Sequence, residues 1–130
     1  MAELLIVDDS KLMREMIVAC LRADPGLSFT HAASGLEAIE QLSLRPFDLV
    51  VLDLNMPDIG GIEVVEFIRG QDTLKALPIV IVTTRGDEAS RTRALEAGAS
   101  RFMTKPFHPQ TILDEVRSLL PKRAEVHSPP

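Results

Sequence analysis

The stretch that decides the fold is residues 49–57, which read Leu-Val-Val-Leu-Asp-Leu-Asn-Met-Pro. Its first four residues are all apolar, a pattern typical of a short strand that is covered on both faces. The strand must end close to Asp53, because Asn55 and Pro57 are turn-forming residues. The stretch therefore predicts a buried strand that delivers a carboxylate to one edge of a sheet.

Four more short β-type runs surround this strand in the sequence. The five strand candidates are residues 4–7, 27–30, 49–52, 79–83 and 101–104. The first, third and fourth are almost wholly apolar, so we expect them at the centre of the sheet. Strands that alternate with helical segments in this way predict five βα units around a parallel sheet.

The segments between the strands have helical period. The expected apolar stripes are Leu12, Met13, Met16, Ile17, Cys20 and Leu21 behind the N-cap Ser10; Leu36, Ile39 and Leu42 behind Ser34; Ile62, Val65 and Ile68 before Gly70; and Ile112, Leu113, Val116 and Leu120 behind His108 and Pro109. The fourth helix, from about Asp87 to Ala97, has Leu95 as its only large apolar residue. We expect it to be the most weakly anchored helix.

Composition excludes several classes of protein. The 130 residues fit one domain, expected over residues 1–120, with a flexible tail or the start of a linker at 121–130. A net charge of −5 argues against direct binding of nucleic acid. Cys20 is the only cysteine, so we expect no intrachain disulfide and a reducing, cytoplasmic location. The apolar run 4–7 is too short for insertion into a membrane.

Polar side chains follow four of the five strand candidates. They are Asp8 and Asp9 after the first strand, Asp53 and Asn55 after the third, Thr83 and Thr84 at the end of the fourth, and Lys105 after the fifth. If the strand order is 2-1-3-4-5, the three carboxylates converge and repel one another unless they are protonated or bridged by a cation. Mg²⁺ suits such a set of oxygen ligands, and Lys105 and Thr83 would offer a charge and a donor to an incoming phosphoryl group.

With these motifs in this order, residues 3–120 resemble a response-regulator receiver domain of two-component signalling, and in particular the single-domain chemotaxis regulators. The motifs are Asp8-Asp9, Asp53-Leu54-Asn55-Met56-Pro57, Val82-Thr83-Thr84, Gly98-Ala99 and Lys105-Pro106-Phe107. The resemblance implies a doubly wound (βα)5 flavodoxin-like fold of the α/β class, with strand order 2-1-3-4-5 and helices on both faces.

The resemblance also implies a role for each site residue. Asp53 would accept a phosphoryl group from a sensor histidine kinase or a phosphotransfer domain, and Lys105 would contact the phosphoryl oxygens. The implied Mg²⁺ ligands are Asp8, Asp9, Asp53 and the backbone carbonyl of Asn55. Thr83 and Phe102 would form a switch pair, although many relatives carry Tyr where Phe102 stands. Asn55 and Arg85 lie where the family varies its rate of dephosphorylation.

The implied output is a surface made of the fourth helix, the fifth strand and the fifth helix, to which a downstream target would bind. The protein would then be a switch rather than an enzyme. An aspartate-nucleophile phosphatase of the haloacid-dehalogenase type is the alternative, but Asn55 removes the second carboxylate of its Asp-x-Asp motif. A flavin-binding flavodoxin is a further alternative, disfavoured because the chain lacks Trp and Tyr. Singly, Asp8 and Asp9 could also be helix caps, Lys105 a neutralising charge, and Phe102 a core residue.

Overall fold

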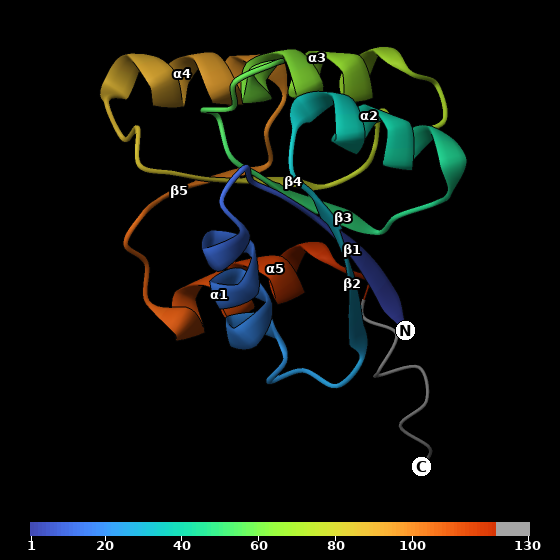
Figure 1. Cartoon of the computed structure of the whole chain (residues 1–130), viewed down its shortest axis with the longest axis vertical. Coiled ribbons are helices and arrows are strands. Elements are labelled where there is room, and N and C mark those ends of the chain that lie inside the picture. Colours follow the sequence, from blue (N-terminus) through green and yellow to red (C-terminus); the bar gives the residue numbers. More distant parts are fainter. Residues whose placement is uncertain (122–130) are drawn as a thin grey trace.

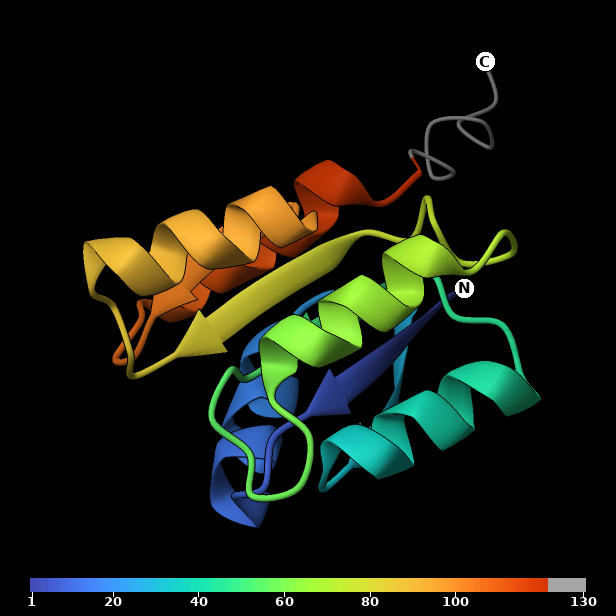
Figure 2. The same ribbon diagram turned by 90° about the horizontal axis from the view of Figure 1, so that it is seen from above.

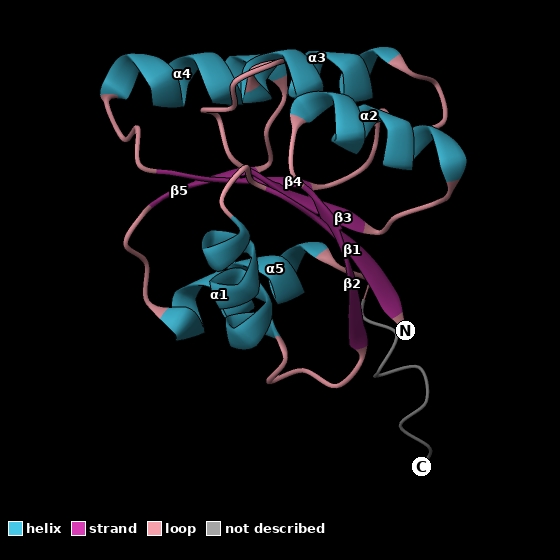
Figure 3. Ribbon diagram, in the orientation of Figure 1, coloured by secondary structure: helices cyan, strands magenta, loops and turns pink. Residues whose placement is uncertain are grey.

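The fold is described from a computed structural model, which describes residues 1–121. Within this range five strands alternate with five helices. The strands are β1 Ala2–Val7, β2 Leu27–Ala32, β3 Leu49–Leu52, β4 Ile79–Thr83 and β5 Arg101–Thr104. The helices are α1 Lys11–Leu21, α2 Gly35–Leu44, α3 Gly61–Gly70, α4 Glu88–Ala97 and α5 Pro109–Leu119 (Figure 3). The predicted tail lies outside the described residues, except for Pro121.

All five strands are parallel and lie in the order β2-β1-β3-β4-β5. Helices α2, α3 and α4 cover one face of the sheet, and α1 and α5 cover the other (Figure 1). Seen from above, α3 and α4 run beside each other, with β4 visible between them (Figure 2). The doubly wound α/β fold with this strand order is therefore confirmed.

Two apolar layers, one on each face, stabilise the sheet. Along β1 the side chains alternate, so that Leu5 and Val7 pack under α2 and α3 while Leu4 and Ile6 pack under α1 and α5. All four are at most 1% exposed. A strand with both faces covered reads as a continuous apolar run, and this explains the composition of the three central strands.

Some details differ from the predictions. Strand β1 begins two residues earlier than predicted, because the backbone N–H of Ala2 donates to the carbonyl of Gly26 and Ala2 pairs with Leu27. On α1, Leu12 and Met16 are 70% and 48% exposed. Ile17 and Leu21 of the predicted stripe are buried, together with Val18, which the stripe did not include, so the buried face of the helix is rotated from the predicted one. Leu36 of α2 is likewise exposed.

Helix α4 has a small buried face. Its buried residues are Ser90 and Ala94, whereas Leu95, expected to be its main packing residue, is 38% exposed. Asp87 caps the helix by accepting hydrogen bonds from both the backbone N–H and the hydroxyl of Ser90. Little apolar area therefore anchors α4, as its sequence leads one to expect. The free energy of local opening of this helix would test the expected weak anchoring.

Candidate functional site

Three carboxylates meet where β1 and β3 end. The backbone N–H of Asp53 donates to the carbonyl of Val7, which fixes the exits of the two strands side by side. One oxygen from each of Asp8, Asp9 and Asp53 lies within 4.8 Å of the others. Asp8 and Asp53 are 1% and 6% exposed, while Asp9 lies at the surface. The predicted convergence of these residues is confirmed.

Lys105 provides the positive charge in this cluster. Its backbone N–H donates to the carbonyl of Thr83, which holds the chain after β5 against the end of β4. Its Nζ donates to Oδ2 of Asp8 at 2.7 Å and lies 3.9 Å from Oδ1 of Asp53. The ammonium group therefore binds Asp8 and stands beside Asp53, within reach of a group attached there.

Asp53 is the least satisfied member of the cluster. Its Oδ1 is buried without a hydrogen-bond partner among the described residues. Burial raises the pKa of the Asp53 carboxyl, and Asp8 adds to this, while the charge of Lys105 opposes it. A buried acceptor in an all-oxygen cluster is a suitable ligand for a hard cation, so the residues present fit the expected Mg²⁺.

Asp8 is fixed by contacts that the sequence did not reveal. Its Oδ1 accepts from the backbone N–H of Ser10 at 2.9 Å, and its carbonyl oxygen accepts from the guanidinium of Arg14. The Nε of Arg14 donates in turn to Nδ1 of His31 at 3.1 Å. Arg14 lies one turn into α1 and faces the site. This position was the only feature of the sequence that could have distinguished Arg14 from the other basic residues.

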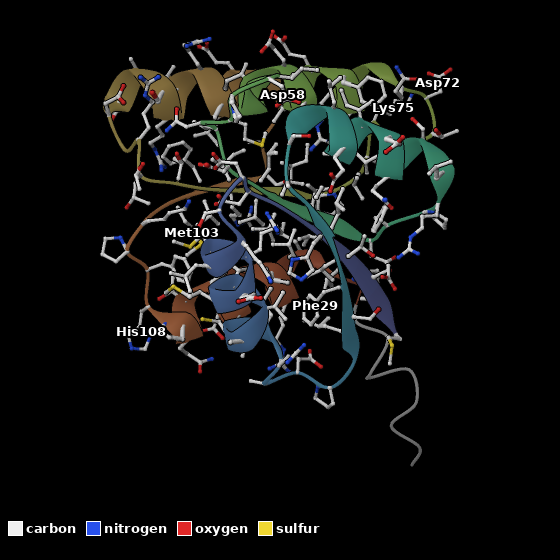
Figure 4. The ribbon with its side chains drawn as sticks, in the orientation of Figure 1. Phe29, Asp58, Asp72, Lys75, Met103 and His108 are labelled. Carbon is white, nitrogen blue, oxygen red and sulfur yellow. The ribbon has the colours of Figure 1, made fainter. Side chains whose placement is uncertain are left out.

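The proposed switch residues lie on neighbouring strands. Thr83 is completely buried at the end of β4, and its Oγ1 accepts from the backbone N–H of Arg85 at 3.2 Å. Its hydroxyl also faces Asp53 and lowers the pKa of that carboxyl, against the larger effect of burial. Phe102 is half-buried on β5 and packs toward the α2–α4 side. The next residue, Met103, points to the opposite side of the sheet, toward α1 and α5 (Figure 4).

Asn55 and Arg85 lie at the rim of the site. Both are exposed, and both line a hollow of about 320 Å³ between the start of α3 and α4. Glu66 and Arg93 line it as well. The structure thus brings the two predicted dephosphorylation-tuning residues to one opening, next to Leu54 and close to Asp53.

The loop between β3 and α3 is held tightly in place. A Cβ on Gly61 would collide with the backbone of Asp53 and Leu54, so glycine is required for this close approach. At the other side of the loop, Asp58 accepts from the backbone N–H groups of Gly35 and Leu36, at 3.1 Å and 2.9 Å, and so joins the loop to the start of α2 (Figure 4). These hydrogen bonds lower the pKa of Asp58 to about 2.

Comparisons with known proteins agree with this geometry. The sequence matches the family described as "Response regulator receiver domain" over residues 4–117. It is 34% identical over 119 residues to the chemotaxis protein CheY1 of Helicobacter pylori, covering 91% of this chain and 96% of that protein. It is 35% identical over 123 residues to the transcriptional regulatory protein ResD of Bacillus subtilis, covering 95% of this chain but 50% of that protein.

Solved structures show the same similarity. A putative response regulator from Chloroflexus aurantiacus superposes with a TM-score of 0.86 at 35% identity, covering 91% of this chain and 96% of that one. The receiver domain of the sensor histidine kinase PA1611 from Pseudomonas aeruginosa, solved with a magnesium ion coordinated in its active-site cleft, has a TM-score of 0.82 at 25% identity. It covers 91% of this chain and 96% of that domain.

No helix within residues 1–121 has both the length and the apolar character required to cross a bilayer. The family match covers most of the chain, and the acidic cluster stands at the sheet edge where that family's fold would place it. This chain therefore belongs to the response regulator receiver domain family and is a phosphoacceptor switch module of two-component signalling.

Proposed function

We propose that Asp53 is the residue that accepts the phosphoryl group, and that the donor is the phosphohistidine of a sensor histidine kinase or a phosphotransfer domain. The observation that carries this proposal is the buried Oδ1 of Asp53, which has no hydrogen-bond partner within residues 1–121 and lies 3.9 Å from the ammonium of Lys105. Asp8 and Asp9 are less suited to the role, because Asp8 is already bonded to Lys105 and Ser10 and Asp9 is exposed. The proposed domain spans residues 1–120.

Asp8, Asp9, Asp53 and the backbone carbonyl of Asn55 would hold Mg²⁺. The convergence of the three carboxylates supports this set, and the magnesium-bound PA1611 receiver domain is a precedent from the same family. When bound, the ion supplies positive charge that offsets the carboxylates and the transferred phosphoryl oxygens. The Asn55 carbonyl lies in the loop that Gly61 and Asp58 hold in place, which favours a fixed position for it.

In the proposed transfer, an oxygen of Asp53 attacks phosphorus while the bond from phosphorus to the histidine nitrogen breaks, and the histidine leaves with that electron pair. No proton needs to be removed from Asp53, since the carboxylate is the nucleophile. Lys105 lies 3.9 Å from Asp53 and would donate to a phosphoryl oxygen, while the Thr83 hydroxyl would donate to another. Positioning and charge neutralisation are the main requirements of phosphoryl transfer.

The test is labelling by acetyl phosphate with Mg²⁺, followed by intact-mass spectrometry. We expect one added phosphoryl group on the wild type and none on Asp53→Asn. Asp48→Asn is the matched control, because Asp48 precedes the same strand at its other end, and it should be labelled normally. Undiminished labelling of Asp53→Asn would refute the assignment.

Phosphorylation is proposed to change the surface formed by α4, β5 and α5, where a downstream target would bind. Drawing the Thr83 hydroxyl toward the phosphoryl group leaves space for the Phe102 ring to turn inward, which gives two packings of one surface. The Thr83→Ala variant should still be phosphorylated, but phosphorylation should have little effect on its binding of the downstream target. Phe102→Tyr should alter that effect only modestly. Beryllofluoride, a phosphoryl mimic, should change the rates of amide hydrogen exchange from Asp53 through residues 87–107. Changes confined to the surroundings of Asp53 would contradict the switch.

Asn55 and Arg85 are proposed to tune dephosphorylation, because both are exposed and line one hollow together with Leu54, the residue that follows Asp53. Exchanging either residue should alter the lifetime of the phosphorylated form, measured by loss of the added mass, without abolishing labelling. Arg93→Gln, on the far side of the same hollow, is the control. Equal lifetimes in all three variants would contradict the tuning role.

A further inference from the structure

Arg14 on α1 holds the peptide bond that joins two of the proposed Mg²⁺ ligands. Its Nη1 donates to the carbonyl oxygen of Asp8, and this carbonyl belongs to the planar peptide between Asp8 and Asp9. The side chain of Asp8 is fixed separately, since its Oδ1 accepts from the backbone N–H of Ser10 and its Oδ2 from Lys105. Asp9 is exposed, so the direction of its carboxylate depends chiefly on how this peptide is oriented.

The guanidinium of Arg14 is itself held by neutral acceptors. Its Nε donates to Nδ1 of His31, on the edge strand β2, at 3.1 Å. Among residues 1–121, Arg14 has no carboxylate oxygen within 4.0 Å of its guanidinium, although it binds the backbone of a residue in the acidic cluster. The side chain therefore links β2 to the end of β1 rather than serving as a counter-charge for the carboxylates.

We propose that Arg14 is a positioning residue for the Mg²⁺ site, and that the neutral imidazole of His31 keeps its guanidinium in the position that this role requires. The inference rests on the ligands proposed above, Asp8 and Asp9 in particular. A guanidinium suits the task because its donors lie in one plane at fixed angles, so one side chain can bind a carbonyl oxygen and a ring nitrogen at once. A lysine ammonium has the same charge but lacks this fixed geometry.

The charge of Arg14 and its position make opposite predictions for Mg²⁺ binding. A positive charge beside a cation site repels the cation, so removal of that charge alone would tighten Mg²⁺ binding. Loss of an outer contact that orients a ligand weakens metal binding, by about tenfold or more. The direction of the change in affinity therefore separates a positioning role from an electrostatic one, and a general loss of stability is measured separately by urea unfolding.

The first experiment measures Mg²⁺ affinity by isothermal titration calorimetry. We expect Arg14→Gln and Arg14→Lys to bind Mg²⁺ roughly tenfold more weakly than the wild type, because neither side chain can make both contacts. Lys11→Gln is the matched control, since Lys11 is an exposed charge in the first turn of the same helix, and it should bind at least as tightly as the wild type. Arg14 variants that bind like Lys11→Gln would overturn the proposal. A wild type that binds no Mg²⁺ would instead refute the proposed function.

His31 makes the arrangement sensitive to pH. Protonation of its Nδ1 removes the acceptor and places a second positive charge beside Arg14. Partial burial of the ring, and then the charge of Arg14, lower the pKa of His31, so the neutral ring is favoured near pH 7. Its register partner on β1 is the apolar Ile6. The other charges near the ring lie on α1 or at its C-cap: Glu15, which raises the pKa, and Arg22 and Lys11, which lower it.

The second experiment follows Mg²⁺ affinity from about pH 8 down to about pH 5.5, a range in which histidine titrates. The fall in affinity should be about threefold larger in the wild type than in His31→Gln, whose amide keeps an acceptor for Arg14 but does not titrate. At the upper pH these two proteins should bind alike, whereas His31→Val, which has no acceptor, should bind weakly throughout the range. Parallel pH profiles of the wild type and His31→Gln, or full affinity in His31→Val, would overturn the role assigned to His31.

Discussion

The two ends of the central strands treat their carboxylates in opposite ways. At the amino end, Glu3 accepts hydrogen bonds from the hydroxyls of Ser28 and Thr30 and from the guanidinium of Arg45, and Asp48 accepts from the backbone N–H of Glu3. At the carboxyl end, Asp53 has an oxygen with no hydrogen-bond partner in the described part of the chain, beside two other carboxylates. The same residue types therefore stabilise the fold at one end and are left available for chemistry at the other.

This contrast fits a division of labour within one sheet. A buried acceptor with satisfied hydrogen bonds contributes to stability, whereas an unsatisfied one costs free energy until a ligand binds it. Functional sites commonly keep such a cost because the group must be free to react.

The largest effect is expected from Gly61→Ala at the site end of α3. A Cβ there would collide with the backbone of Asp53 and Leu54, so unfolding free energy should fall by roughly 2 kcal/mol and labelling of Asp53 should slow. Gly70→Ala, at the other end of the same helix, has open space and should be neutral or stabilising by up to about 1 kcal/mol. Urea unfolding of both variants measures these changes. An equal loss of unfolding free energy in Gly61→Ala and Gly70→Ala would contradict the expected difference between the two ends of α3.

Neutralising one carboxylate at each end should change stability in opposite directions. Without Mg²⁺, Asp53→Asn should raise the unfolding free energy by about 1 kcal/mol, since it removes a buried charge from a like-charged cluster. Glu3→Gln should lower it by a similar or smaller amount, about 0.5–1 kcal/mol, because its ion pair with Arg45 is partly exposed to solvent. Chemical unfolding in EDTA measures both, and the same sign in both variants would contradict the division of labour.

Mg²⁺ should act on one end only. Asp9→Asn should weaken Mg²⁺ binding on the order of tenfold, because it removes one of three converging carboxylates, while raising the stability of the metal-free protein. Glu3→Gln should leave Mg²⁺ affinity unchanged. Thermal melts across a Mg²⁺ titration provide the readout. An Asp9→Asn protein that melts no higher than the wild type in EDTA, or gains as much from Mg²⁺, would argue against the acidic-cluster interpretation.

The smallest effect concerns pH, and it separates Asp53 from Asp58. The folded pKa of Asp58 is lowered from 3.8 to about 2, so its contribution is present above pH 3.8 and is lost as the pH falls toward 2. The folded pKa of Asp53 is raised, so its ionisation lowers stability as the pH rises above 3.8. In the Asp58→Asn variant, the urea unfolding midpoint should therefore no longer fall as the pH is lowered toward 2. In the Asp53→Asn variant, the midpoint should decline less than in the wild type as the pH rises above 4. Unchanged slopes would show that neither carboxyl is perturbed as described.

Much of the fold and of the site was predictable because strand exits are visible in the sequence. The apolar runs ending in Asp8 and Asp53 predict both the central strands and the convergence of their carboxylates, since parallel strands end at the same edge. Local pattern does not determine which way a helix turns its apolar residues. Leu12 and Met16 share the helical period of Ile17, and only the position of α1 on the sheet decides which of them are buried.

Contacts between distant segments were the part that the sequence could not give. Lys105 was expected to contact the phosphoryl group or to neutralise the carboxylates, but the sequence did not reveal that its ammonium donates a hydrogen bond to Asp8 in particular. The loop contact of Asp58 with the start of α2 joins residues 22 and 23 positions apart, and no local motif marks it. Arg14 was missed for the same reason, because an arginine on an exposed helix turn usually has no such task.

The bond between Lys105 and Asp8 joins residues 97 positions apart, from the first and last strands to be synthesised. During translation, a nascent chain that has reached only β4 already holds the three clustered carboxylates but not the ammonium that balances them. Contacts of such long sequence separation form late, after the intervening segments have been ordered. On the role proposed for Lys105, a chain becomes able to accept a phosphoryl group only when synthesis has passed that residue, so incomplete chains should not compete with finished molecules for the kinase.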